Sequence, residues 1–596
     1  MNYPVWYLPE TGGGLLIALI AILHVFVSHF AVGGGLYLIY AEKKGLRENS
    51  SAILEFTRKH ARFFLLLTMV FGSITGVGIW FIIALVNPAA TSFLIHNFVF
   101  GWAAEWVFFV VEIAAAFVYY YMFGRMDSST HLKVGWLYFI AAWMSLFLIN
   151  GIIGVMLTPG SWAENMNFWV GFFNPSFFPS LFFRTFIALM IAACYGYLSA
   201  SFTREEPVRV SMTRFSAKWA LVSLGCAVPA GLWYLSVLPG EPYNLVMGKS
   251  PTIATVLPWG AAGAVLLLVI MLAAGIKNPE RNLKPVALMA IVSALAIMGS
   301  FEWTREAARR PFVINEVMYS NSIFKNDVDR LNNEGFLQTA LWVENKEISD
   351  SNRVQAGEEL FIHQCYSCHT VNGRNNDIVK ATEKMSYRAL SKYIEKIHKV
   401  RFFMPPFAGI EDENMALAAY ITGGLHGKDT SDFRKPAGFA SVAHGAVLFE
   451  EHCSSCHAVE DIVSGFEGLE RAEIVVMLNS LDEVSEEMEP FSGTPEEGSE
   501  LAGYLSSLAN NTEPAAPAGD DEEGQVQGRL LFEDNCSACH EQGDLSEALL
   551  DQDKEKVFTL FATLDEISDE MEPFHGTAQE KEALADFLTG LNKGGE

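Results

Sequence analysis

Long apolar segments fill the first half of this 596-residue chain and constrain its fold more than any other feature. Eight of them are long enough to cross a bilayer, which takes about 20 apolar residues of α-helix. They cover residues 15–40, 63–86, 98–123, 136–157, 181–201, 219–237, 256–276 and 285–305. Lipid leaves no water to bond the backbone, so such segments must be helical. The sequence therefore predicts an all-α, polytopic bundle of about eight transmembrane helices over residues 1–312.

Lysine and arginine alternate between the connections of these segments. Basic residues follow the first, third, fifth and seventh segments, whereas the connections after the second and fourth have none. By the positive-inside rule, the N-terminus and the chain after residue 305 then lie on the outer side. No basic residue precedes Lys43, so the first segment is expected to stay as an anchor rather than to be a cleaved signal peptide. We expect a multi-pass protein of the cell inner membrane with a periplasmic C-terminal half.

Three C-x-x-C-H sequences follow in the second half. GEELFIHQCYSCH ends at His369, GAVLFEEHCSSCH at His457 and GRLLFEDNCSACH at His540. C-x-x-C-H is the attachment pattern of c-type haem, in which two thiols bond the vinyl groups and the histidine ligates the iron. A single match also fits chance or a redox pair, but three in the same local context predict three covalent c-type haems. The attachment cysteines are Cys365, Cys368, Cys453, Cys456, Cys536 and Cys539.

A methionine beside or near a proline follows each repeat. FMPPFAG contains Met404, EEMEPFSGT contains Met488 and DEMEPFHGT contains Met571, which lie 35, 31 and 31 residues after the respective histidines. We predict that each methionine is the sixth ligand of its haem iron. Ligation by His and Met raises the haem potential, so these are comparatively oxidising centres. Each repeat ends in a short helix, and all three resemble small class I cytochrome c domains.

The repeats divide the second half into domains. We predict a connector at 313–350, cytochrome c domains at 351–430, 436–509 and 526–594, and an acidic Pro/Ala linker at 510–525. Residues 431–596 carry 38 Asp and Glu against 8 Lys and Arg, although the whole chain has a net charge of only −27. Two interpretations stay open: a solvated acidic face, or a docking surface for a basic periplasmic electron-transfer protein such as a soluble cytochrome c. No nucleic-acid partner is expected.

Short motifs in the first 312 residues resemble, in order, subunit I of cytochrome bd-type oxidases. AILHVFVSHFAVGGG resembles the first helix of that subunit, GSITG its Gly-rich second helix and EWVFFVVE its third. NGIIGVMLTP resembles the end of its fourth helix, and EAARRPF resembles its Glu-x-x-Arg-x-Pro-aromatic signature. The resemblance implies two non-covalent haems of b or d type in the bundle. It also implies a second membrane subunit or a larger respiratory complex.

The resemblance assigns roles to single residues of the bundle. His24 matches the axial ligand of one haem, and Glu306 matches the carboxylate ligand of the other. Glu112 matches an acid of the proton and haem region. Glu105 is offset by one residue from the first acid of that family. Both acids are expected to supply protons.

Several charges surround Glu306 at the end of the last apolar segment. Arg309 matches the arginine that is expected to pair with a haem propionate, and Arg305 or Arg310 is a candidate for a second such pair. Glu302 lies one helical turn before Glu306 and shares its face, so it is expected to support that ligand or to carry protons. The alternative is a helix end whose long basic side chains extend toward water.

The chain departs from the bd family where that family binds its low-spin haem. Asn174-Pro175 is followed by Arg184 near the ligand position with no histidine, and the segment PWGAAGAV lacks the partner methionine. The loop that handles quinol is reduced to residues 239–255, and the ninth helix is replaced by the cytochrome tail. We therefore expect the low-spin b haem to be absent and electrons to arrive from the periplasmic side.

Three functions fit these patterns. The first is a bd-like haem oxidase that receives electrons from a periplasmic donor through the c haems and reduces O2, or alternatively NO or another small oxidant. The second is a quinol dehydrogenase that passes electrons outward through the c haems. The third is a non-catalytic cytochrome c subunit that anchors a larger respiratory complex. We favour the first, an oxidoreductase, because the His/Met haems are oxidising and the quinol loop is short.

Overall fold

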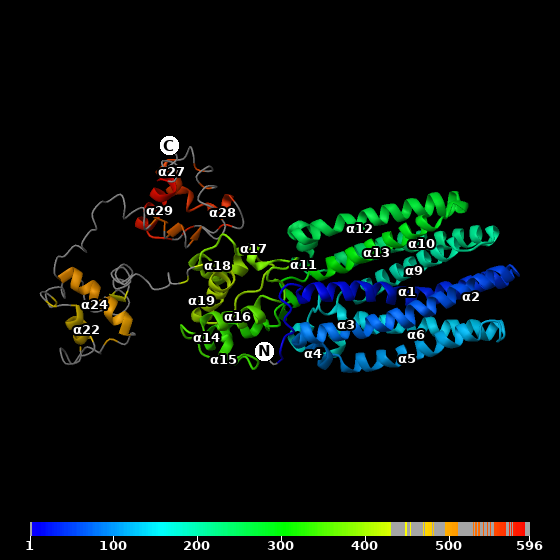
Figure 1. The fold of residues 1–596 in the computed structure, drawn as a ribbon, viewed down its shortest axis with the longest axis horizontal. Coiled ribbons are helices and arrows are strands. Elements are labelled where there is room, and N and C mark those ends of the chain that lie inside the picture. The colour runs from blue at the N-terminus through cyan, green and yellow to red at the C-terminus, as the bar shows by residue number, and fades with distance from the viewer. Residues whose placement is uncertain are drawn as a thin grey trace. The chain divides into compact units, whose positions relative to one another are not determined.

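A computed structural model describes residues 3–428 and 430 of the protein and parts of the remaining chain (Figure 1). The other described residues are 448–449, 453, 466, 469, 471–478, 481, 491, 495–509, 528–529, 531–532, 535–536, 540, 545, 549, 553–567, 571, 574 and 576–590. The chain forms two compact units. One comprises residues 1–381 and 395–417, and the other comprises residues 382–394 and 418–596.

Eight helices of the first unit are long and apolar enough to cross a membrane, which confirms the predicted multi-pass bundle. They run side by side in Figure 1. They are α1 (Gly13–Arg47), α2 (Ser51–Leu66) continued by η1 (Leu67–Gly72) and α3 (Ser73–Val86), α5 (Val99–Tyr121), α6 (Ser128–Gly154), α9 (Phe177–Ser201), α10 (Glu206–Ser236), α12 (Pro251–Ile270) continued by η3 (Met271–Lys277), and α13 (Lys284–Ala307).

The helices extend beyond the predicted apolar segments at the end where basic residues gather. The prediction that these residues lie in connections is wrong for most of them, because they belong to the helices. Lys43, Lys44 and Arg47 are part of α1, Arg58 and Lys59 of α2, and Arg209, Arg214 and Lys218 of α10. Helical hydrogen bonding does not stop at the edge of the hydrocarbon layer, and long basic side chains reach water from such positions.

Glycines let α1 approach its neighbours closely. A Cβ added to Gly33 would overlap the backbone carbonyl of Ala188 in α9, and one added to Gly35 would overlap the Tyr138 ring of α6. Small residues at such contacts allow membrane helices to pack backbone to backbone. The AVGGG stretch therefore fixes α1 against two other helices.

Gly33→Ala is expected to lower the free energy of unfolding by about 1–3 kcal/mol, because the added methyl group forces two helix backbones apart. Gly225→Ala is a matched control in the middle of α10, where an added Cβ meets nothing within 4 Å. Alanine favours helix over glycine, so the control is expected to be neutral or slightly stabilising. Thermal unfolding in detergent measures both. Equal unfolding midpoints for the two variants would contradict the packing of α1.

Short elements complete the first unit, and the all-α fold class is confirmed. The connections contain α4 (Pro88–Asn97), α7 (Trp162–Asn165), α8 (Phe168–Phe172), α11 (Gly240–Asn244), η2 (Leu245–Lys249) and η4 (Pro279–Arg281). Within the described residues, the only sheet is the antiparallel pair β1 (Phe312–Ile314) and β2 (Met318–Tyr319). The connector continues with η5 (Lys325–Asp327), α14 (Val328–Glu334) and α15 (Phe336–Thr339).

The repeats form small helical segments with cores of their own. The first contains α16 (Arg353–Gln364), α17 (Ile378–Thr382), α18 (Tyr387–Val400), α19 (Glu411–Ala419) and η6 (Tyr420–Leu425). The second contains α22 (Arg471–Leu478) and α24 (Pro495–Ala509), and the third contains α27 (Lys554–Leu560), α28 (Leu564–Ile567) and α29 (Ala578–Gly590). Separate apolar clusters lie in the second and third repeats. The domain boundaries at 313–350, 351–430, 436–509, 510–525 and 526–594 remain predictions.

Candidate electron-transfer site

The first C-x-x-C-H sequence forms a tight turn directly after α16. The His369 amide donates to the Cys365 carbonyl at 3.0 Å, so both cysteines and the histidine share one turn. The His369 Nδ1 donates to the Asn376 carbonyl at 3.0 Å, which leaves Nε2 with its lone pair. Burial lowers the pKa of His369, which favours the neutral imidazole that a metal needs. The turn therefore fits a covalent haem held by Cys365, Cys368 and His369.

The segment around Met404 is tied to the same turn. Gln364, the last residue of α16, donates to the Ala408 carbonyl at 2.8 Å and accepts from the Ala408 amide at 3.0 Å. The His398 Nδ1 donates to the Met404 carbonyl at 2.7 Å. The Gln364 bonds thus tie Ala408, four residues after the predicted methionine ligand, to the helix that leads into the attachment turn. Gln364 and His398 were not predicted from the sequence, because the other two repeats have no glutamine just before C-x-x-C-H.

The first attachment turn also contacts the segment that leaves the bundle. The Arg310 guanidinium lies 2.7 Å from the Cys368 Sγ, which in a haem-bearing chain is a thioether sulfur. The Tyr366 hydroxyl accepts from the Leu8 amide at 2.9 Å and donates to the Trp6 carbonyl at 3.1 Å. Arg310 therefore lies against the first haem turn, whereas the sequence analysis placed it near a haem of the bundle.

The other two repeats show the same local hydrogen bonds where they are described. The Cys453 amide donates to the Phe449 carbonyl and the Cys536 amide to the Phe532 carbonyl, both at 2.8 Å. The His540 amide donates to the Cys536 carbonyl at 3.0 Å, as His369 does in the first repeat. Met571 is half-buried. The remaining predicted ligands and attachment sites, Cys456, His457, Met488 and Cys539, lie outside the described residues.

His24 in α1 is seated by the Gly-rich motif of the second segment. Its Nδ1 lies 3.2 Å from the Thr75 hydroxyl, and that hydroxyl donates to the Phe71 carbonyl at 2.8 Å. Nδ1 is therefore the donor, and Nε2 keeps the lone pair that an iron would take. A Cβ on Gly76 would lie 3.2 Å from the imidazole carbon Cε1. The Nε2 of His24 therefore has the free lone pair that a haem iron would need.

His29 offers similar chemistry one turn further along α1. Its Nδ1 donates to the Val25 carbonyl at 2.8 Å, and its Nε2 is buried without a hydrogen-bond partner. A buried imidazole nitrogen that keeps its lone pair is a candidate metal ligand. Only His24 was predicted as a ligand from the sequence of this helix, although His29 lies in the same apolar segment.

His24 and Glu306 lie too far apart along the bundle to ligate one iron. A Cβ on Gly299 in α13 would lie 3.9 Å from the Ile22 side chain in α1, which places these two residues at one level. α1 and α13 run in opposite directions, so Glu306 and His24 lie to opposite sides of that level. At 1.5 Å per residue the difference is about 13 Å. The two residues therefore suit two separate groups, as the sequence analysis expected.

Arg309, just after the end of α13, contacts both the predicted ligand Glu306 and the start of β1. The Arg309 guanidinium pairs with the Glu306 carboxylate and donates to the Val313 carbonyl at 2.6 Å. The Arg309 side chain is buried, but the Glu306 side chain is 45% exposed. Arg309 therefore restrains both Glu306 and the start of β1.

Glu302 belongs to a different ion cluster from Glu306. It accepts from Arg184 of α9 at 2.7 Å and from Arg305 at 2.9 Å. Arg184 and Glu302 are only 3% and 8% exposed, and the Arg184 guanidinium also lies over the Phe301 ring at 5.1 Å. Arg184, which was predicted to lie near the ligand position of the bd family, thus has a buried carboxylate partner. The structure does not bring Glu302 and Glu306 together by any direct bond.

Acidic and phenolic side chains form a stripe along α5. Glu105, Glu112 and Tyr119 follow one another at intervals of seven residues, so they share one helix face. Glu105 accepts from the Ser145 hydroxyl at 2.5 Å, and Glu112 accepts from the Tyr138 hydroxyl at 3.1 Å. Both hydroxyl partners come from α6. The two predicted proton carriers are therefore hydrogen-bonded to the same neighbouring helix.

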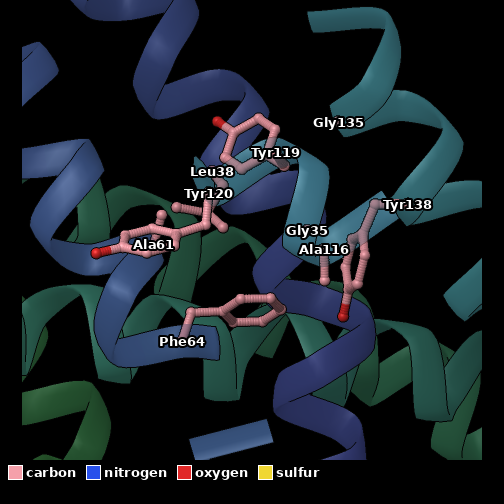
Figure 2. A pocket seen from close by; sticks show the side chains of 9 residues that line it. All are labelled: Gly35, Leu38, Ala61, Phe64, Ala116, Tyr119, Tyr120, Gly135 and Tyr138. Carbon is pink, nitrogen blue, oxygen red and sulfur yellow. The ribbon is translucent and has the colours of Figure 1, made fainter. Parts of the chain in front are cut away.

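The stripe ends in a buried triad that sequence analysis missed. Glu42 of α1 accepts from the Tyr119 hydroxyl at 2.7 Å and contacts the His131 Nδ1 at 2.8 Å. The His131 Nε2 donates to the Tyr119 carbonyl at 2.8 Å. Figure 2 shows the cavity between Tyr119 and Tyr138, whose hydroxyls point in opposite directions. An acid inside the last turns of α1 was the only sequence signal for this triad.

Two segments of the chain, residues 352–421 and 525–588, match the family model described as cytochrome C oxidase, cbb3-type, subunit III. These two segments are similar to c-type cytochrome domains. The matched segments contain the first and third C-x-x-C-H sequences, so covalent c-type haem is implied there. The second repeat lies outside the matched residues and remains a prediction.

Two further comparisons concern the whole chain. No curated protein matches it. Among solved structures, the bd oxidase from Geobacillus thermodenitrificans aligns over 51% of this chain and 89% of its own, with 16% identity and a TM-score of 0.44. The membrane bundle and the cytochrome domains together indicate membrane electron transfer.

Proposed function

We propose that this protein is a respiratory haem oxidoreductase that receives electrons from a periplasmic donor through its cytochrome c domains and reduces O2 within the membrane bundle. The contact between Arg310 and Cys368 carries this proposal. It joins the first haem-attachment turn to a residue that lies four positions after Glu306, the predicted haem ligand. Both predicted haem sites therefore belong to one compact unit.

The residues of the chain then have distinct tasks. Bound haems supply electron transfer and the iron at which O2 binds. The His24 Nε2 and the Glu306 carboxylate are the protein ligands of the two bundle haems, and Arg309 orients Glu306. His369 and Met404 hold the first c haem. The proposal keeps the expected absence of the low-spin haem, since Arg184, near the predicted ligand position, is paired with the buried Glu302 carboxylate.

Protons for O2 reduction are proposed to move along the α5 stripe. The Glu42, His131 and Tyr119 triad lies at the end of the bundle with the basic residues, which the positive-inside rule assigns to the cytoplasm. Glu112 and Glu105 follow at successive levels toward the other side, each bonded to a hydroxyl that can pass a proton. The triad therefore takes up protons and the two acids deliver them.

The proposed setting rests on the distribution of basic residues and on the resemblance to the bd family. The cytochrome domains and the N-terminus lie on the periplasmic side of the inner membrane. A second membrane subunit or a larger respiratory complex covers part of the bundle, and a basic electron-transfer protein docks to the acidic residues after 431.

The test is an optical spectrum of the purified, dithionite-reduced protein with and without CO. We expect c-type bands together with a CO-sensitive high-spin haem, which His24→Ala removes while the c-type bands persist. A spectrum with c-type bands alone would contradict the oxidase and favour an anchoring subunit. Oxygen uptake is expected with reduced cytochrome c and not with quinol; uptake only with quinol would also contradict the proposal.

The variant Glu112→Gln tests whether Glu112 carries protons for the reduction of O2. Loss of a positioned proton carrier is expected to lower oxygen uptake by roughly 10²-fold or more. The CO spectrum is expected to remain, because Glu112 is not a haem ligand in the proposal. Unchanged oxygen uptake would remove Glu112 from the proton path.

A further inference from the structure

A cavity of about 830 Å³ lies between α1 and α10 at the basic end of the bundle. Its lining residues are Tyr40, Lys43, Lys44 and Arg47 of α1, and Pro207, Val210, Ser211, Arg214, Phe215 and Lys218 of α10. The spacings of three and four residues mean that one face of each helix lines the cavity. A hydrogen bond of 2.8 Å between the Tyr37 and Ser216 hydroxyls joins the two helices beside it.

The cavity has far more positive than negative charge. Among its five basic side chains, Lys44 and Arg47 share one carboxylate, Glu48, at 2.5 and 4.0 Å. Lys43 lies over the rings of Tyr40 and Trp136 instead. Within the described part of the chain, neither Arg214 nor Lys218 has a carboxylate within 4.0 Å, and both are exposed. Like charges that face one cavity repel each other, so an anion between them is favourable.

The cavity lies at the level of lipid headgroups. The apolar run of α1 ends at Tyr40, and the apolar part of α10 begins after Lys218. The Tyr40 and Trp219 rings pack edge to face at 5.4 Å, as expected for aromatic residues at a membrane–water interface. A soluble anion needs no apolar lining, whereas Tyr40, Val210 and Phe215 give the cavity one.

We propose that this cavity binds the phosphate headgroup of an anionic phospholipid. Arg214 and Lys218 lie one turn apart and donate to the phosphate oxygens, and Lys43 completes the site from α1. Val210 and Phe215 contact the glycerol and the start of the acyl chains. Basic pockets between transmembrane helices on the cytoplasmic side are suited to such headgroups. This inference does not depend on the reduction of O2.

The test is native mass spectrometry of the full chain in detergent, titrated with phosphatidylglycerol, phosphatidylcholine or inorganic phosphate. The variant is Arg214→Gln with Lys218→Gln. Because each basic residue near an anionic lipid contributes about fivefold, the variant is expected to bind phosphatidylglycerol roughly 25-fold more weakly. The matched control is Arg125→Gln with Lys133→Gln, two exposed basic residues at the same end that do not line the cavity. The control is expected to bind like the wild type.

Three results would overturn the proposal. Equal weakening in the control would assign the effect to general surface charge. Binding of inorganic phosphate that competes with phosphatidylglycerol at the same concentration would indicate a soluble anion. Equal binding of phosphatidylcholine and phosphatidylglycerol by the wild type would exclude recognition of the anionic headgroup, and this comparison needs no variant. Arg214→Lys with Lys218→Arg keeps the charge and is expected to retain binding.

Discussion

Replacing Cys365 and Cys368 with alanine is expected to abolish electron delivery to the bundle. The first attachment turn contacts Arg310 and belongs to the same compact unit as His24 and Glu306. Without its covalent haem, we expect oxygen uptake from a reduced soluble cytochrome c to fall at least about 100-fold, equivalent to about 2.7 kcal/mol in the barrier. A pyridine haemochrome assay is expected to show the loss of one of three c haems, and an oxygen electrode measures the rate.

The equivalent change in the third repeat tests whether electron delivery depends on the first haem in particular or only on the number of c haems. Cys536→Ala with Cys539→Ala removes one haem as well, but from the other compact unit. A small artificial one-electron donor is expected to reduce this variant at a rate close to the wild type, since it can reach the first haem directly. If both double variants lost the same activity with the small donor, the first c haem would not be the one that passes electrons to the bundle.

Arg184→Ala is expected to be the most destabilising single change in the bundle. It leaves the Glu302 carboxylate buried with Arg305 as its one remaining partner. Breaking a buried ion pair from one side costs about 3–5 kcal/mol in the free energy of unfolding, because the abandoned charge stays desolvated. The remaining bond to Arg305 places the expected loss near 3 kcal/mol on that scale. Thermal unfolding in detergent gives the measurement.

An exposed ion pair provides the control for Arg184. Lys325 and Glu316 are also in direct contact, but both side chains are about half exposed. Lys325→Ala is therefore expected to cost less than about 1 kcal/mol. Arg184→Met with Glu302→Gln is expected to recover part of the stability, because it removes both charges. An equally small loss for Arg184→Ala and Lys325→Ala would mean that the pair is hydrated.

Local patterns were enough to predict the membrane helices of this protein. A transmembrane helix is recognised by the length of its apolar run, and all eight were found this way. The C-x-x-C-H turn is equally local, since its hydrogen bonds join residues four apart. Helix ends were less predictable, because basic residues such as Lys43 and Lys218 continue the helix instead of ending it.

The contacts that organise the site are not local. Glu302 meets Arg184 across 118 residues, and His131 meets Glu42 across 89. A charge in an apolar helix signals that a partner exists, but its identity depends on which helices are neighbours. The sequence offered Glu306 as the neighbour of Glu302, because it is the nearest charge on the same helix face, whereas the bonded partners in the structure are Arg184 and Arg305. The role of Glu302 remains a prediction.

The hydrogen bond between Tyr366 and Leu8 can form only late in the synthesis of the chain. The two residues are 358 positions apart, and all eight membrane helices lie between them. During translation this contact forms only after the last helix and the first C-x-x-C-H sequence have been made. Closing so long a loop costs entropy that the packed bundle must offset. We therefore expect the segment before α1 to dock against the first cytochrome segment only after the bundle is complete.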